Sequence, residues 1–348
     1  MRIKNYTPFP MLCYEGRGVD DTPFDTVVVR ATLDLGERRV LRLAQEQTPL
    51  AFKDEYFGET ARSSVRSESD LAPAKHCSDI VVIGSAHAPG GAPLPSWPVS
   101  VKVGDLEKHL RVTGPRAWVR GAGGFTLTDP EPCTEVPLRY ELAFGGVARH
   151  GDRELACESN PLGVGFAPSF SLEGRDRIEA PRIEDPQDPV TSLGKTHRPE
   201  GVGVWGRTWP PRLQRAGTYD EAWKKERWPK LPLDFDFTYW NCAHPDLIAP
   251  GLLRGDEEIL LAGLDPAGER RYRLPGHRVF VLLERSPGEA ESRRMYLDTL
   301  VLDLERNKAI LLYRIVLPWP QPQSLEVRME FRDPAETEAR MEVSDVGR

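Results

Sequence analysis

The chain has 348 residues, of which 39% are hydrophobic, 32 are proline and 30 are glycine, and this is the composition of a folded, turn-rich protein. Its net charge is -7, with the two signs interspersed, and no run of Lys or Arg supplies the basic surface that binds a phosphate backbone. Length and composition therefore favour one large β domain or two ordinary domains, and they argue against direct nucleic-acid binding.

The cysteines and the first residues indicate a compartment. The five cysteines are an odd number without regular spacing, which predicts neither a disulfide framework nor a zinc ribbon. The opening MRIKNYTPFPMLCYEG lacks the apolar stretch of a secretory signal, and no later segment approaches the roughly 20 apolar residues of a membrane span. We therefore expect a cytoplasmic protein.

Residues 1–150 predict an N-terminal β region built from short strands. In the segment 26–33, Val27, Val29, Ala31 and Leu33 alternate with more polar positions, which gives one strand face an apolar surface. Further strands are expected at Asp79–Ile83, Val99–Val103, Leu106–Val112 and Arg116–Val119. Glycines lie between or beside these strands, so we expect an antiparallel sheet.

Residues 151–215 predict a Gly/Pro-rich binding or lid loop. Between Asn160 and Pro211 the chain has eight prolines and seven glycines and few apolar runs. Loops of this length are usually lids, binding loops or linkers. Trp205 and Trp209 lie on either side of Arg207, which favours an ordered surface loop over a flexible tether.

Residues 216–348 predict a C-terminal β region with two helices. Thr218 and Glu221 have the spacing of a capping box, and Pro229 ends the expected helix at residues 219–227. A C-terminal helix is expected from Asp333. Strands are expected at Glu258–Ala262 and Arg278–Leu283, and as a hairpin at Tyr296–Leu304 and Ala309–Leu317. The predicted fold is mainly β, with two packed antiparallel β regions in a sandwich or barrel-like arrangement, long Gly/Pro-rich loops and few short helices.

Two patterns suggest cofactors, and the sequence favours neither. Gly201, Gly203 and Gly206 match the bare dinucleotide fingerprint, but the following Pro210 and Pro211 cannot begin the helix that would bind the pyrophosphate. Metal ligands are conceivable among His76, Cys77, Asp79 and His87, and at Cys242 and His244, without the spacing of a known metal motif. We expect no metal and no organic cofactor.

Catalytic groupings are equally weak. Asp234 and Asp236 alternate with Phe235 and Phe237, which would place both carboxylates on one strand face, although solvent-facing Asp with core-facing Phe explains the pattern better. Ser85 lies near His87, but the chain has no G-x-S-x-G nucleophile elbow. The sequence therefore favours a protein that is not an enzyme.

Aromatic and arginine side chains gather around the end of the Gly/Pro-rich segment. These types often anchor protein interfaces, because they bury a large area and carry a polar group. They can equally attach the loop to the sheet, and the sequence leaves both roles open. The candidate partner-binding residues are Trp205, Arg207, Trp209, Arg212, Tyr219 and Trp223.

Long ordered segments of the chain resemble a known family. They include SESDLAPAK, PLRYELAFGG, NPLGVGF, AGTYDEAW, LPLDFDF and LDTLVLDLE. With these segments the chain resembles the bacterial domain-of-unknown-function family 2169, whose members are associated with type VI secretion. The resemblance implies a cytoplasmic adaptor or chaperone that binds a secretion effector, often one linked to a PAAR-like protein, and helps load it onto the secretion spike. The alternative from a different class is a hydrolytic β-fold enzyme, possibly acting on carbohydrate, that uses Asp234, Asp236 or His87.

Overall fold

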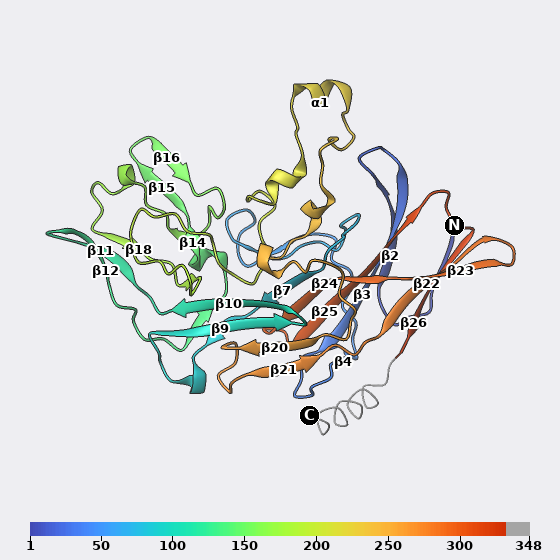
Figure 1. The fold of residues 1–348 in the computed structure, drawn as a ribbon, viewed down its shortest axis with the longest axis horizontal. Coiled ribbons are helices and arrows are strands. Elements are labelled where there is room, and N and C mark those ends of the chain that lie inside the picture. The colour runs from blue at the N-terminus through green and yellow to red at the C-terminus, as the bar shows by residue number, and fades with distance from the viewer. Residues whose placement is uncertain (332–348) are drawn as a thin grey trace.

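The computed structural model describes residues 1–331, and most of its regular structure is β-strand (Figure 1). Its one α-helix in this range is the short α1 (Glu221–Glu226). Six short 3-10 helices lie in the connections: Pro89–Gly91, Tyr140–Leu142, Ser169–Ser171, Leu213–Ala216, Phe237–Trp240 and Pro245–Leu247. The mainly β prediction is confirmed, whereas the helix expected from Asp333 lies outside the described residues.

A six-stranded sheet forms the centre of the molecule. Its strand order is β2-β3-β25-β24-β7, with β4 beside β3. The strands are β2 (Met11–Arg17), β3 (Pro23–Asp34), β4 (Arg42–Leu43), β7 (Asp79–Ile83), β24 (Tyr296–Asp303) and β25 (Lys308–Pro318). The hairpin predicted at 296–317 is confirmed, because β24 and β25 are antiparallel neighbours in which Leu300 lies opposite Leu311.

Two further large sheets flank this one (Figure 1). The four-stranded sheet contains, in order, β1 (Arg2–Asn5), β26 (Ser324–Glu330), β22 (Arg278–Ser286) and β23 (Glu289–Arg294). The five-stranded sheet contains, in order, β19 (Ile183–Glu184), β10 (Leu106–Thr113), β9 (Ser96–Val103), β20 (Glu258–Ala262) and β21 (Arg270–Arg273).

Each large sheet takes strands from both ends of the chain. β3 pairs with β25, β9 pairs with β20, and β1 pairs with β26. The segments 1–150 and 216–348 therefore share their sheets instead of forming one sheet each. Two of the pairings in these sheets, β7 with β24 and β1 with β26, are parallel, a detail that local alternation does not reveal because it reports a strand's faces and not its distant partner.

The predicted alternation of β3 separates two environments. Val27, Val29, Ala31 and Leu33 are at most 2% exposed and belong to one continuous core that includes residues of all three large sheets. The opposite face of β3 carries Arg30 and is overlaid by residues 48–75, here called the covering segment.

Residues 151–215 do not form a free lid. The segment contains β16 (Arg153–Ala156), β17 (Val164–Gly165), β18 (Arg177–Glu179) and β19, and β18 and β19 pair with β11 (Ala117–Gly121) and β10. Ile178 and Val190 pack with Trp118 in a small second hydrophobic cluster. The segment is attached because its scattered apolar residues are buried, although their spacing has no regular period.

The remaining strands form short pairs. They are β5 (Glu55–Tyr56) with β6 (Val65–Ser67), β8 (Ser85–His87) with β13 (Glu135–Pro137), β14 (Phe144–Gly145) with β17, β15 (Val147–His150) with β16, and β12 (Gly124–Leu127) beside β11. Within residues 1–331, no helix has the length and hydropathy required to cross a membrane.

Helix α1 is shorter than predicted and has a different N-cap. The Asp220 side chain accepts a hydrogen bond from the Trp223 backbone N–H at 2.8 Å, so Asp220 is the N-cap. Thr218, the expected cap, instead donates its hydroxyl to Asp234 at 2.7 Å. The capping-box spacing was therefore coincidental, because a better acceptor lies two residues closer to the helix.

Candidate functional site

The six candidate partner-binding residues divide into two groups. Trp205, Trp209 and Arg212 are buried, with 2%, 5% and 2% of their surface exposed. Tyr219 is 53% exposed, and Arg207 and Trp223 are partly exposed. The three buried side chains are inaccessible to a partner in this conformation, so the prediction that they line a contact surface requires correction.

Arg212 joins three segments that are distant in sequence. Its guanidinium donates two hydrogen bonds to the two oxygens of Glu68, at 2.6 Å and 2.8 Å. It also donates to the backbone carbonyls of Tyr239 and Trp205, both at 2.8 Å. The end of the Gly/Pro-rich segment is thereby fixed to the covering segment and to residues 237–240.

Trp205 and Trp209 pack around Tyr140. The ring centroids of Tyr140 and Trp209 lie 5.1 Å apart, and those of Tyr140 and Trp205 lie 5.7 Å apart, both edge-to-face. The glycines of the GVGVWG stretch serve this packing: a Cβ at Gly201 would lie 2.9 Å from the Tyr140 ring, and one at Gly206 would lie 2.6 Å from the Trp209 ring. The two tryptophans thus attach the segment to the core, which is the structural role that the sequence left open.

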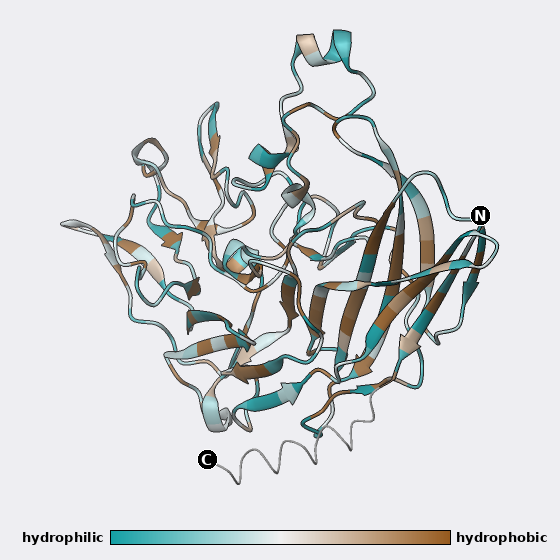
Figure 2. Ribbon diagram, turned by 45° about the vertical axis from the view of Figure 1, so that its right-hand side comes forward, coloured by the Kyte–Doolittle hydropathy of each residue, from teal (hydrophilic) through white to brown (hydrophobic). Residues whose placement is uncertain are grey.

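Of the exposed candidates, Tyr219 and Trp223 lie on an arm formed by residues 217–236, whereas Arg207 pairs with Asp54 and Glu68 of the covering segment. The arm projects from the body with α1 at its tip (Figures 1 and 2). Tyr219, Trp223 and Trp228 form a continuous row of rings, with centroid distances of 4.6 Å and 5.6 Å. Trp228 and Leu233 are each 70% exposed. Exposed aromatic groups held in one row are typical of protein-binding surfaces.

Close to α1, the arm is also attached to a neighbouring turn. Arg227 donates to the backbone carbonyl of Val19 at 2.6 Å, and the Lys230 ammonium lies 2.7 Å from the Asp21 carboxylate, so the arm contacts the turn between β2 and β3. Trp223 donates its indole N–H to the Lys230 carbonyl at 2.9 Å. These contacts fix the aromatic row before any partner arrives, which reduces the entropy lost on binding.

The two carboxylates considered for catalysis stabilise turns at the base of the arm. Asp234 accepts hydrogen bonds from the backbone N–H and hydroxyl of Thr218, which lower the pKa of its carboxyl. Asp236 caps a 3-10 helix by accepting from the Thr238 N–H at 2.8 Å. Residues 234–237 form no strand, because each Asp makes a local turn contact instead. His87 lies on β8, and none of the three lines either of the two large cavities found in residues 1–331.

Asp79, a residue of the weak metal pattern, is a buried anchor. Its carboxylate accepts from the backbone N–H groups of Cys242 and Ala243 at 3.0 Å and 3.1 Å, and from the Lys75 ammonium at 2.6 Å. Burial, together with the Asp79 charge, raises the pKa of the Cys242 thiol far above its ordinary value. The carboxylate of Asp79 is thus engaged by three donors, which fits a structural role for this group.

One group of side chains has the geometry of metal ligands. Glu200, His244 and Asp246 offer ligand atoms within 4.8 Å of one another. The Lys108 ammonium lies 2.6 Å from Glu200 and 2.9 Å from Asp246, and Arg198 bonds both carboxylates. Burial and the nearby Lys108 charge lower the pKa of His244 well below its ordinary value. Because two cationic side chains already neutralise the carboxylates, the group fits a buried ion-pair network better than a metal site.

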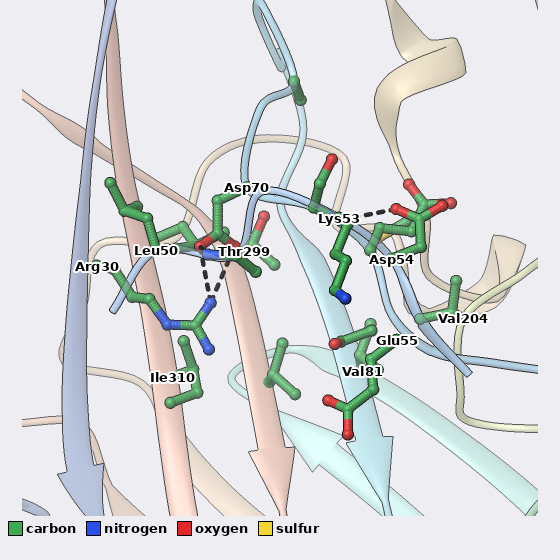
Figure 3. A pocket seen from close by; sticks show the side chains of 18 of the residues that line it. Arg30, Leu50, Lys53, Asp54, Glu55, Asp70, Val81, Val204, Thr299 and Ile310 are labelled. Atoms are coloured by element: carbon green, nitrogen blue, oxygen red, sulfur yellow. Dashed lines mark hydrogen bonds and ion pairs between the residues drawn. The ribbon is translucent and has the colours of Figure 1, made fainter. Parts of the chain in front are cut away.

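A cavity of about 690 Å³ lies between the central sheet and the covering segment (Figure 3). Its floor is one face of the sheet, where Val301 lies opposite Ile310 and beside Val81, and Leu312 lies opposite Arg30. Sequence reasoning missed this site, as it missed Trp228 and Leu233 on the arm. The sequence offered one signal for it: polar residues alternate with apolar ones along β3, so one face of this strand differs from the face that belongs to the hydrophobic core.

Comparison with known proteins identifies one family. The sequence model of a family described as an uncharacterized protein conserved in bacteria (DUF2169) matches residues 21–314. This match includes β3, β4, β7, β24 and most of β25 of the central sheet, together with the covering segment and the arm. No curated protein and no solved structure matches the chain.

Proposed function

We propose that this chain, which belongs to the bacterial family of uncharacterized proteins DUF2169, is an adaptor or chaperone that binds a type VI secretion effector and holds it for loading onto the spike. The partner would be the effector itself or a PAAR-like or spike protein joined to it. The work takes place in the cytoplasm, where effectors are made.

One observation carries this proposal more than any other: the projecting arm presents Tyr219, Trp223 and Trp228 as a fixed aromatic row. Trp and Tyr dominate the binding energy of many protein interfaces, because they bury large apolar areas with little loss of side-chain entropy. Tyr219 at one end of the row is 53% exposed and Trp228 at the other end is 70% exposed, so a partner can bury much of their surface. The family resemblance supplies the class of partner.

The hydrolytic alternative has less support. Asp234 and Asp236 are engaged in turns, and His87 belongs to a different part of the fold. A glycosidase pair requires two carboxylates that face one another across the substrate. The described residues offer no such arrangement at these three positions.

A genetic experiment tests the function. The gene is deleted, and the abundance of each type VI effector in the cells and in the medium is compared with the parent strain. The adaptor predicts that one effector disappears from the medium and that its cellular level falls, and that the wild-type gene restores both. Unchanged secretion and abundance of every effector would contradict the proposal.

A further inference from the structure

The cavity beneath the covering segment has the features of a ligand site. Its volume of about 690 Å³ lies within the range of roughly 300–1,000 Å³ that small-molecule sites occupy. The floor contributes the apolar side chains of Val301, Ile310 and Leu312, and the exposed Phe52 lies at its edge. An apolar floor with a few converging polar groups is the common composition of such sites.

The charges that line the cavity are almost fully paired, each acidic side chain having a basic partner. The pairs are Asp54 with Arg207, Glu55 with Arg306, Glu68 with Arg212, Asp70 with Arg30, and Asp303 with Arg66. The other lining cations are paired as well, Lys75 with Asp79, Lys308 with Asp34, and Arg314 with Asp298. Lys53 is the exception, since it has no ion pair within residues 1–331.

Lys53 is placed to meet a ligand. Figure 3 shows its side chain extending from the covering segment toward the sheet. Arg30 reaches the same cavity from β3, where its Nε donates a hydrogen bond to Thr48 and its Nη1 donates to Asp70. Within the described residues its Nη2 makes no hydrogen bond, which leaves a second donor. Lys53 is itself exposed, so the cavity has at its edge one ammonium group without an ion pair in the described part of the chain, beside an apolar floor.

We propose that this cavity binds an amphipathic carboxylate, with the anionic group paired to Lys53 and the apolar part lying on Val301, Ile310 and Leu312. A single carboxylate matches a single unpaired ammonium, whereas a phosphate carries more charge and calls for more donors. The carboxylate belongs either to a free carboxylic acid or to the C-terminus of a peptide with apolar side chains. This inference is independent of effector binding by the arm.

Titration calorimetry on the full chain at neutral pH tests the site with defined probes. Octanoate represents the free acid, with octylamine as the chain of opposite charge. The tripeptide acetyl-Leu-Val-Leu with a free carboxylate represents the peptide, with its C-terminal amide as the control. We expect octanoate or the peptide acid to bind at one site, whichever source is correct, and octylamine and the peptide amide to bind at least tenfold more weakly.

Three variants locate the site. Lys53→Met should weaken binding of the carboxylate probe about tenfold, or about 1.4 kcal/mol. Lys225→Met, at an exposed lysine of α1 that does not line the cavity, should leave it unchanged. Val301→Phe should fill the floor and abolish binding, and Lys53→Met keeps the test decisive if that variant fails to fold. The inference is overturned if neither carboxylate probe binds, if octylamine binds as tightly as octanoate, if Lys53→Met binds normally, or if folded Val301→Phe binds with full affinity.

Discussion

The guanidinium of Arg212 and the carboxylate of Glu68 form a bidentate ion pair inside the protein, with N–O distances of 2.6 Å and 2.8 Å. Residues 144 positions apart in the chain are thereby joined, and the Gly/Pro-rich segment is fixed beside the covering segment. Arg212 has the chemistry of an interface residue, yet its partner is within its own chain. The contact surface that we propose therefore lies on the arm and not on this segment.

Packing of the aromatic cluster gives the first prediction. Trp209→Ala should lower the free energy of unfolding by about 3–5 kcal/mol, because it removes a buried ring that packs on Tyr140 and leaves a cavity. Thermal melts of the purified variant measure this loss. Trp319→Ala, at a tryptophan that is 44% exposed, is the matched control and should melt close to the wild type. A Trp209→Ala melting temperature equal to that of the control would show that the ring is not a structural anchor.

The Glu68–Arg212 pair gives a prediction on pH. Burial alone would raise the pKa of Glu68, but hydrogen bonds and charge from Arg212 and Arg207 hold it below its ordinary value. The folded pKa is thus lower than the unfolded one of about 4.3, so the stabilisation is complete above that pH and is lost as the pH falls through the folded pKa.

Glu68→Gln should therefore be less stable than the wild type at pH 7, by about 3–5 kcal/mol for a broken buried pair. Urea denaturation across the acidic range should show this difference shrinking as the pH falls below about 4.3. Glu226→Gln, on the exposed surface of α1, is the control. A difference between Glu68→Gln and the wild type that stays constant with pH would count against the ion pair as its source.

The buried Asp79–Lys75 pair gives a third prediction. Asp79→Asn removes the charge that faces the Lys75 ammonium, so each of Asp79→Asn and Lys75→Met should destabilise the fold, and the double variant should lose less than the sum. Chemical denaturation of the four proteins gives the coupling energy, which we expect to exceed about 1 kcal/mol. Additive losses would mean that the two side chains act independently.

The sequence predicted the features that depend on neighbouring residues. The strand β3 and the β24–β25 hairpin follow from side-chain period and a short turn, and both are present, although the covering segment leaves both faces of β3 largely buried. The pairing of β3 with β25 was not predictable, because it joins strands nearly the whole chain apart and local pattern carries no record of that partner.

The same limit applies to the candidate site. Trp205 and Trp228 belong to the same residue type, and only the tertiary structure makes one 2% and the other 70% exposed. Tyr219 and Trp223 were found because aromatic residues gather in this part of the sequence, whereas Lys53 and the cavity arise from a covering segment with little regular structure. Residue type predicted an interface near this part of the chain, and the fold shows which of the rings are exposed.

The exposed rings of the arm should contribute little to the stability of the fold. The double variant Tyr219→Ala/Trp228→Ala removes two exposed rings, so its melting temperature should stay close to that of the wild type. Circular dichroism and a thermal melt check this expectation. A large drop in melting temperature would instead mean that the aromatic row stabilises the protein itself.

The most direct test of the central claim is secretion of the effector identified by gene deletion, measured in strains that express wild-type protein, Trp228→Ala or Trp319→Ala at equal levels. We predict that Trp228→Ala weakens binding of the purified effector by about 2 kcal/mol, roughly thirtyfold, and reduces its secretion, because removing a large aromatic side chain from the centre of an interface typically costs this much binding free energy. Trp319→Ala should bind and secrete as the wild type does. Normal effector binding and secretion by Trp228→Ala and by the Tyr219→Ala/Trp228→Ala variant would contradict the assignment of the arm as the contact surface.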